Sequence, residues 1–206
     1  MTKLINLHTH KFSNLSDVIE VVNQYPWEFD ASIPNYSIGI HPWYIDENRL
    51  ESDLEIIKEK LQLSECLALG ECGLDKRIEI PLDLQISVFK KQLEIVKQTK
   101  KPIVLHCVAA YDEVIAIKKE MKIENSMIIH GFSKNEQVAK TLLDNGFYLS
   151  FGKYLLRNPD LEKVFTFAPE NQILLETDTI EESIYQVYEK AAAIKGISVE
   201  EMKTIV

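Results

Sequence analysis

Short hydrophobic runs alternate with amphipathic stretches along the chain, and this alternation predicts the fold. Each run has about five or six residues, which is the usual length of a strand, and several are continuously apolar, as expected for strands buried on both faces. These runs predict eight strands, at residues 4–8, 18–22, 36–41, 66–71, 102–106, 126–130, 147–151 and 172–178.

The stretches between the runs have the periodicity of helices. Leu50, Leu54 and Ile57 are four and three residues apart, a spacing that places them on one face of a helix. Gly146 and Gly196 follow two such stretches and indicate where those helices end. The pattern predicts helices at 47–62, 82–100, 111–122, 134–145 and 181–196.

Alternating strands and helices are typical of a parallel sheet, and eight strands favour a closed TIM-type (β/α)8 barrel. We predict one such domain over residues 1–206. The stretch between His10 and the third predicted strand is too short for two full helices, so the first crossovers should be short. The alternative is an open doubly wound sheet, but the sequence has no glycine-rich phosphate loop to support it.

The composition narrows the class of protein. A formal net charge of −9 disfavours tight binding to a nucleic-acid duplex, which normally needs a basic surface. The three cysteines form no CxxC pair, which favours a reducing compartment. No apolar run approaches the roughly 20 residues of a membrane span, and the start of the chain lacks a signal-peptide cleavage site. We expect a soluble cytoplasmic protein, with no membrane contact and no obligate protein partner.

Potential metal ligands lie where predicted strands end. The carboxyl ends of the strands of a parallel barrel all point to one face, so these side chains should meet at one mouth. Imidazoles bind zinc, iron or nickel, and carboxylates also bind magnesium or manganese. Residues i and i+2 of a strand face the same side, so the first two histidines can contact one ion. The candidates are His8, His10, His41, His106, His130, Glu71 and Asp178.

Each candidate alone has a structural interpretation. A single histidine at a strand end can be a hydrogen-bonded structural residue, and Glu71 or Asp178 could cap a helix. All five histidines lie at strand ends, however, which favours a shared metal site. Cys72 and Cys107 each follow a candidate ligand directly, so strand alternation turns them to the other side as buried thiols rather than nucleophiles.

Six short motifs resemble, in order, those of the TatD family of metal-dependent hydrolases, which have amidohydrolase-like barrels. The match extends from His8 to about residue 195. The motifs are HTH at 8–10, GIHP at 39–42, GECGLD at 70–75, PIVLH at 102–106, HGF at 130–132 and ETD at 176–178.

The resemblance implies a site for two divalent ions, which could be Mg, Mn or Zn. It implies that one ion is bound by His8, His10 and Asp178. It also implies that His106 and His130 bind the second ion and that Glu71 bridges the two. His41 matches a family histidine that is not a usual ligand, and either contacts substrate or packs against Pro42 and Trp43. Asp75 caps a helix, orients a ligand or contacts substrate.

The sequence departs from the family pattern at several positions. Asn6 and Leu7 replace the acidic residue that often precedes the first motif, and Thr179 stands where a proline is common. Val108 stands where many members have an arginine that would help to hold a phosphate. The chain ends at Val206, before the residues that close the last helix of many members, so we expect the final turn to lie outside it.

The resemblance implies hydrolysis by a metal-activated water, with Glu71 setting the distance between the ions and Asp178 as general base. The family suggests phosphodiester hydrolysis by a deoxyribonuclease or 3'-5' exonuclease. The substrate would then be single-stranded DNA ends or a small phosphoester. Trp43, Tyr44 and Phe132 could stack on bases or pack at the rim. Alternatives are an amide or ester hydrolase, which Val108 favours, and a metal-binding scaffold without activity.

Overall fold

A computed structural model describes residues 3–206 and contains one eight-stranded sheet in the order β1 to β8. After β8 the chain returns to β1, where the Thr177 N–H donates a hydrogen bond to the His8 carbonyl oxygen. This topology confirms the (β/α)8 prediction. The strands are β1 Leu4–Thr9, β2 Val18–Gln24, β3 Tyr36–Ile38, β4 Cys66–Asp75, β5 Ile103–Val108, β6 Met127–Ile129, β7 Phe147–Phe151 and β8 Ile173–Leu175.

The helices confirm the five predicted stretches and add three short ones. The predicted helices are α1 Leu50–Lys60, α2 Leu82–Val96, α3 Tyr111–Glu120, α4 Glu136–Asp144 and α7 Ile184–Lys195. The additional helices are α5 Lys153–Arg157, α6 Asp160–Phe167 and α8 Val199–Ile205. Three 3-10 helices are η1 Pro26–Glu28, η2 Pro42–Tyr44 and η3 Glu170–Gln172.

The early crossovers are short, as predicted. Residues 10–17, between β1 and β2, contain no helix, and the connection from β2 to β3 contains only η1. The chain divides into two compact units, which we call the terminal unit (residues 3–22 and 129–206) and the central unit (residues 23–128). A single domain over residues 1–206 stays a prediction.

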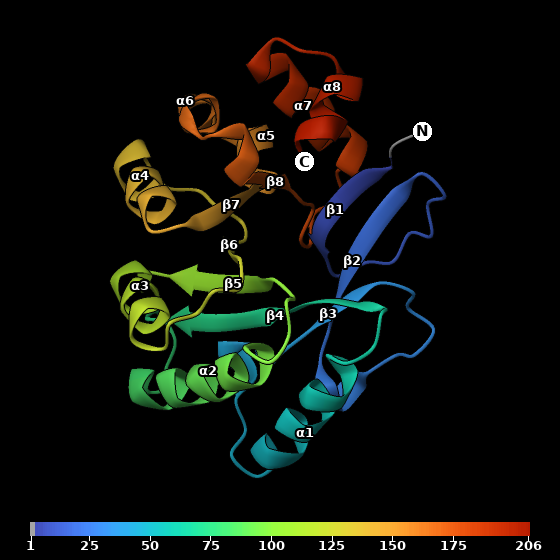
Figure 1. Ribbon diagram of the computed structural model, residues 1–206. Coiled ribbons are helices and arrows are strands. Elements are labelled where there is room, and N and C mark those ends of the chain that lie inside the picture. Colours follow the sequence, from blue (N-terminus) through green and yellow to red (C-terminus); the bar gives the residue numbers. More distant parts are fainter. Residues whose placement is uncertain (1–2) are drawn as a thin grey trace. The chain divides into compact units, whose positions relative to one another are not determined.

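The central unit places α2 against β4, and α3 lies beside β5 (Figure 1). Strands β4 and β5 run parallel with Gly73 paired to His106 and Asp75 paired to Val108. Gly73 has a φ of 138°, and a Cβ at this position would collide with the carbonyl oxygen of His106. The glycine therefore allows the two strands that carry candidate site residues to approach closely.

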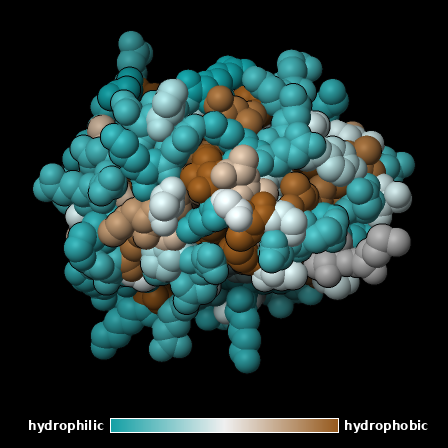
Figure 2. Space-filling model, turned by 90° about the horizontal axis from the view of Figure 1, so that it is seen from above, coloured by the Kyte–Doolittle hydropathy of each residue, from teal (hydrophilic) through white to brown (hydrophobic). Residues whose placement is uncertain are grey.

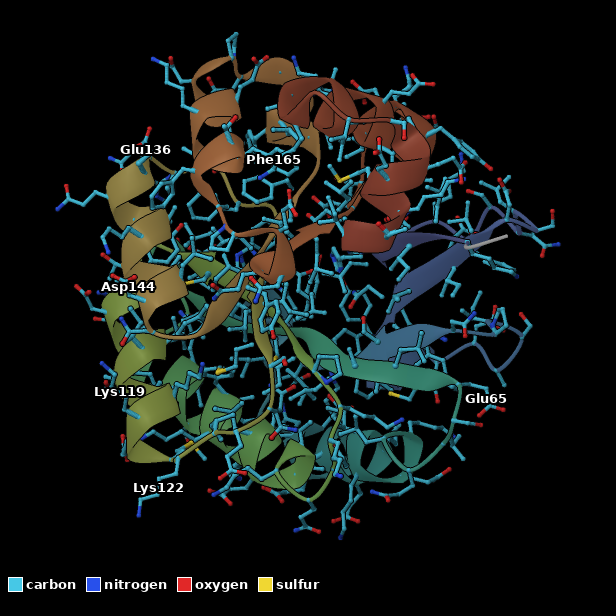
Figure 3. All side chains as sticks on the ribbon, turned by 45° about the horizontal axis from the view of Figure 1, so that its top comes forward. Glu65, Lys119, Lys122, Glu136, Asp144 and Phe165 are labelled. Atoms are coloured by element: carbon cyan, nitrogen blue, oxygen red, sulfur yellow. The ribbon has the colours of Figure 1, made fainter. Side chains whose placement is uncertain are left out.

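The terminal unit pairs β1 with β2 and β7 with β8, in both cases in parallel. Glu136 and Asp144 mark the beginning and the end of α4, and Phe165 lies among other side chains on α6 (Figure 3). The Phe165 ring contacts Phe151 of β7 edge to face, with 5.0 Å between ring centroids. Such pairs fix the helix layer on the strands by burying apolar surface.

Three strands end earlier than predicted, so three candidate ligands lie on the loops that follow them. β3 ends at Ile38, and His41 instead caps η2 by accepting a hydrogen bond from the Trp43 N–H. β6 ends at Ile129, and a turn at Gly131, with a φ of 56°, follows His130 directly. Asp178 has a φ of 53°, a left-handed conformation that ends the extended backbone.

The face shown in Figure 2 is mainly hydrophilic, with a few hydrophobic residues between the polar ones. Among the helices of residues 3–206, none is long and apolar enough to cross a membrane.

Candidate metal-binding site

In the terminal unit, two histidines of the first motif face one carboxylate. The Nε2 atoms of His8 and His10 lie 3.7 and 3.5 Å from Oδ1 of Asp178. One donor atom from each of the three residues lies within 4.8 Å of the other two. Donors that each bind one ion at about 2 Å lie roughly 3–4 Å apart, so this set has the size and chemistry of a divalent-metal site.

The backbone after β8 holds Asp178 against β1. Its N–H donates to the His8 carbonyl oxygen at 2.9 Å, and the His10 N–H donates to the Asp178 carbonyl oxygen at 3.1 Å. The side chain of Asn6 strengthens this junction, because it accepts from the Thr177 N–H at 3.0 Å and donates to Thr177 Oγ1 at 2.9 Å. Asn6 thus replaces the family acid with a residue that positions the loop carrying Asp178.

The carboxylate of Glu176, the first residue of the ETD motif, holds His130 in place. Oε1 of Glu176 accepts from the Gly131 N–H at 2.8 Å and lies 3.3 Å from His130 Nδ1. Glu176 is buried, and burial raises its pKa. Its contacts with His130 and His8 outweigh that effect and hold the pKa below its usual range. The carboxylate therefore stays charged and fixes the orientation of the imidazole. The rings of His8 and His130 are 4.5 Å apart between centroids.

In the central unit, Glu71 lies between two histidines. Its Oε1 is 3.2 Å from His41 Nε2 and 3.0 Å from His106 Nδ1, which makes a second set of donors close enough for an ion. The Glu71 backbone N–H donates to Asn23 Oδ1 at 2.7 Å, so the end of β2 fixes the strand that carries this carboxylate. His41 accepts from the Trp43 N–H through Nδ1, which leaves the proton of a neutral ring on Nε2, facing Glu71. In this tautomer His41 donates to Glu71, and the atoms left to bind an ion are Glu71 Oε1 and His106 Nδ1.

Asp75 contacts the other nitrogen of His106. Its Oδ2 lies 3.1 Å from His106 Nε2 and accepts from the indole Nε1–H of Trp43 at 2.8 Å, while Oδ1 accepts from the Arg77 N–H. Burial raises the pKa of Asp75, but the hydrogen bonds from Trp43, Arg77 and His106 together hold it below its usual range. Of the three roles considered for Asp75, the geometry supports orientation of a ligand.

Other predictions concern residues beside these clusters. Cys72 and Cys107 are buried, as predicted, and burial raises the pKa of the Cys107 thiol to about 12, which makes it a poor nucleophile. Phe132 is only 2% exposed, so its interpretation as a base-stacking residue is wrong. Trp43 and Tyr44 are 52% and 43% exposed, which leaves stacking open to both.

The structure distributes the predicted site residues between the two units. His8, His10, His130 and Asp178 belong to the terminal unit, whereas the others, His41, Glu71 and His106, belong to the central unit. Sequence reasoning missed Asn6, Asn23 and Glu176 as positioning residues. Glu176 had a signal because it belongs to the ETD motif, and Asn6 had one because it stands beside the first motif, where an acidic residue is common.

Comparison with known proteins matches the family model described as TatD related DNase to residues 1–206. An uncharacterised metal-dependent hydrolase, YabD of Bacillus subtilis, is 32% identical over 169 residues, which cover 80% of this chain and 63% of the relative. A 3'-5' ssDNA/RNA exonuclease, TatD of Erwinia billingiae, is 27% identical over 146 residues, which cover 68% of this chain and 55% of that protein. The chain thus spans less than two thirds of the length of these relatives.

Solved structures agree on the fold. The crystal structure of YjjV, a TatD homologue from Escherichia coli K12, superposes with a TM-score of 0.82 and covers 99% of this chain and 95% of that one, at 20% identity. The fold, the motifs and the family model lead to one assignment: the chain belongs to the TatD family of metal-dependent hydrolases.

Proposed function

We propose that the chain is a divalent-metal-dependent hydrolase that cleaves phosphodiester bonds at the ends of single-stranded DNA. The observation that carries this proposal is the triad of His8, His10 and Asp178, whose donor atoms have the spacing of ligands to one ion. A relative named as a 3'-5' ssDNA/RNA exonuclease supports the substrate class. The acidic net charge of −9 fits action on short strand ends better than tight binding along a duplex.

The candidate residues have separate proposed roles in binding metal. His8 and His10 would hold an ion through Nε2, together with Oδ1 of Asp178. In the central unit, Oε1 of Glu71 and Nδ1 of His106 would be the donors to an ion. A bound divalent ion supplies Lewis-acid stabilisation of the phosphoryl oxygens and lowers the pKa of water. The roles of Glu71 as a bridge between two ions and of His130 as a ligand stay predictions of the family resemblance, as does the identity of the metal.

Asp178 is also the proposed general base. Its Oδ1 faces the two imidazoles, so Oδ2 is the oxygen that accepts a proton from the attacking water. His41 is buried between Glu71 and the turn at Pro42, and its contact with substrate stays a prediction.

The proposed function predicts metal-dependent release of nucleotides. Protein freed of metal with a chelator should release nucleotides from an end-labelled single-stranded oligonucleotide only after addition of Mg, Mn or Zn. The same preparations should be tested on a p-nitrophenyl ester and on an aryl amide. If none of the metals gives nucleotide release, the nuclease proposal is wrong.

An amide or ester hydrolase is the second candidate, because Val108 ends β5 where an arginine would help to hold a phosphate. Metal-dependent cleavage of the p-nitrophenyl ester or the aryl amide, without any cleavage of DNA, would favour it.

Glu176→Gln should weaken metal binding by about 10- to 100-fold while leaving the fold intact. The amide keeps the shape of the side chain but removes the charge that Oε1 presents to His130 Nδ1. Competition with a chromogenic chelator, on protein first freed of metal, measures the affinity. Glu170→Gln makes the same change at an exposed position and should leave the affinity unaltered. Equal affinities for wild type and Glu176→Gln would contradict the assigned role.

A further inference from the structure

Trp43 is exposed and fixed at the same time. About half of its surface, 52%, is accessible, yet its indole N–H donates to the buried Asp75 carboxylate at 2.8 Å. Its ring also meets His41 and His106 edge to face, with 5.0 and 5.6 Å between centroids. An exposed aromatic ring normally changes rotamer readily, whereas these three contacts hold the indole plane in one orientation.

The fixed indole lies beside a candidate metal ligand. Oδ2 of Asp75, which accepts the Trp43 N–H, also lies 3.1 Å from Nε2 of His106. One carboxylate oxygen therefore sets the positions of both the indole and the imidazole. A flat group that stacks on the indole is placed at a defined position relative to His106, without a further loss of side-chain entropy at Trp43.

The neighbouring aromatic side chains are less suited to this task. Tyr44 is engaged with Tyr25 and Trp27, at centroid distances of 5.3 and 6.0 Å, and Phe132 is buried. Arg49 lies over the Trp27 ring at 3.8 Å and covers one of its faces. Tyr44 also meets the His41 ring, at 5.6 Å between centroids. Of the aromatic residues of η1 and η2, Trp43 combines an exposed ring with a hydrogen bond to Asp75 and with ring contacts to both His41 and His106.

We propose that Trp43 is a substrate-contacting residue that stacks on an aromatic ring of the substrate. This inference rests on the proposed function, under which that ring is the base of the terminal nucleotide. Stacking of a base on an aromatic side chain tolerates every base, because each has a π face, so Trp43 confers affinity for strand ends without sequence preference.

Fluorescence tests this contact without metal or turnover. The chain has two tryptophans, so Trp27→Phe leaves Trp43 as the only indole and keeps an aromatic ring at position 27. Deoxyadenosine monophosphate should quench the emission of this variant saturably, because the base stacks on the indole. Deoxyribose 5-phosphate, which lacks the base, should not quench it. Absence of quenching by the nucleotide, or equal quenching by both compounds, would overturn the inference.

Kinetics test the consequence for hydrolysis. Trp43→Leu should raise KM for a single-stranded oligonucleotide by about 5- to 100-fold, the range expected for loss of one stacked base. KM for an oligonucleotide with an abasic terminal residue should hardly change. Trp43→Phe keeps an aromatic ring and should therefore retain most of the affinity, although it loses the N–H bond to Asp75. Phe167→Leu removes another exposed aromatic ring, at the end of α6, and is the matched control.

The outcomes separate this inference from the proposed function. If the wild type cleaves DNA but Trp43→Leu affects normal and abasic ends equally, Trp43 is not a stacking residue and the nuclease function stands. If the wild type cleaves no DNA with any metal, the proposed function is wrong, and the quenching experiment still decides whether Trp43 binds an aromatic ring.

Discussion

Asp178→Asn should lower the rate of hydrolysis by at least about 10³-fold while the chain remains folded. The substitution removes the negative charge that faces the Nε2 atoms of His8 and His10, and it removes the oxygen proposed to accept a proton from water. Loss of a general base alone costs about 10²–10⁴-fold, and a weakened ion adds to that loss. The rate should be measured with excess metal on a labelled oligonucleotide.

Asparagine is the right replacement for a physical reason. Asp178 has a φ of 53°, and asparagine adopts this left-handed conformation more readily than alanine does. The backbone bonds of Asp178 to His8 and His10 do not involve the side chain, so the loop should keep its position. A thermal melt should therefore match that of the wild type. Asp144→Asn, at the exposed end of α4, is the control.

Two outcomes separate the roles of this residue. If excess metal restores the rate of Asp178→Asn, the side chain acts as a ligand and not as the base. If Asp178→Asn hydrolyses the oligonucleotide at the wild-type rate even at limiting metal, both roles are contradicted. His8, His10 and Asp178 would then take no part in the mechanism.

The hydrophobic pattern predicted the strands because buried side chains are mostly apolar, so a buried strand appears in the sequence as an apolar run. It missed α5 and α6, where Pro159 divides one amphipathic stretch into two short helices. It also missed α8, although Ser198 and Glu201 form a capping box whose spacing is visible in the sequence. Each of these helices is shorter than the window of roughly 11–18 residues over which the hydrophobic periodicity of a helix is assessed.

The candidate ligands were predictable because each lies within a strand or in the loop directly after one, whereas the residues that hold them in place were not predictable. Asn6 and Thr177 are 171 positions apart in sequence, and Trp43 and Asp75 are 32 apart. Nothing local marks such pairs, because their contact depends on the strand register and on where each strand stops. The hydrophobic pattern also predicted three strands that are too long. His41, His130 and Asp178 were placed at the ends of these strands but lie in the loops that follow them.

Glu71→Gln is the second change with a large expected effect, a loss of at least about 100-fold in hydrolysis. Both His41 and His106 face the single atom Oε1, so the charge of this carboxylate dominates the cluster of the central unit. An ion held there contributes several kcal/mol of transition-state stabilisation, which corresponds to about 10²–10⁴-fold in rate. Glutamine keeps the volume, and Asn23 holds the backbone N–H, so the fold should persist.

The control for this change comes from the residue just before the same strand. Glu65 directly precedes β4 and is exposed (labelled in Figure 3). Glu65→Gln should therefore leave the rate within about twofold of the wild type, as expected for an exposed position. The metal content of each variant should be measured after the same metal-loading procedure. Comparison with the hydrolysis rate then shows whether a change in rate follows from a change in metal binding. If Glu71→Gln loses the rate but keeps the full metal content, Glu71 acts on the substrate or the water. If it keeps both, the cluster around Glu71 has no part in hydrolysis.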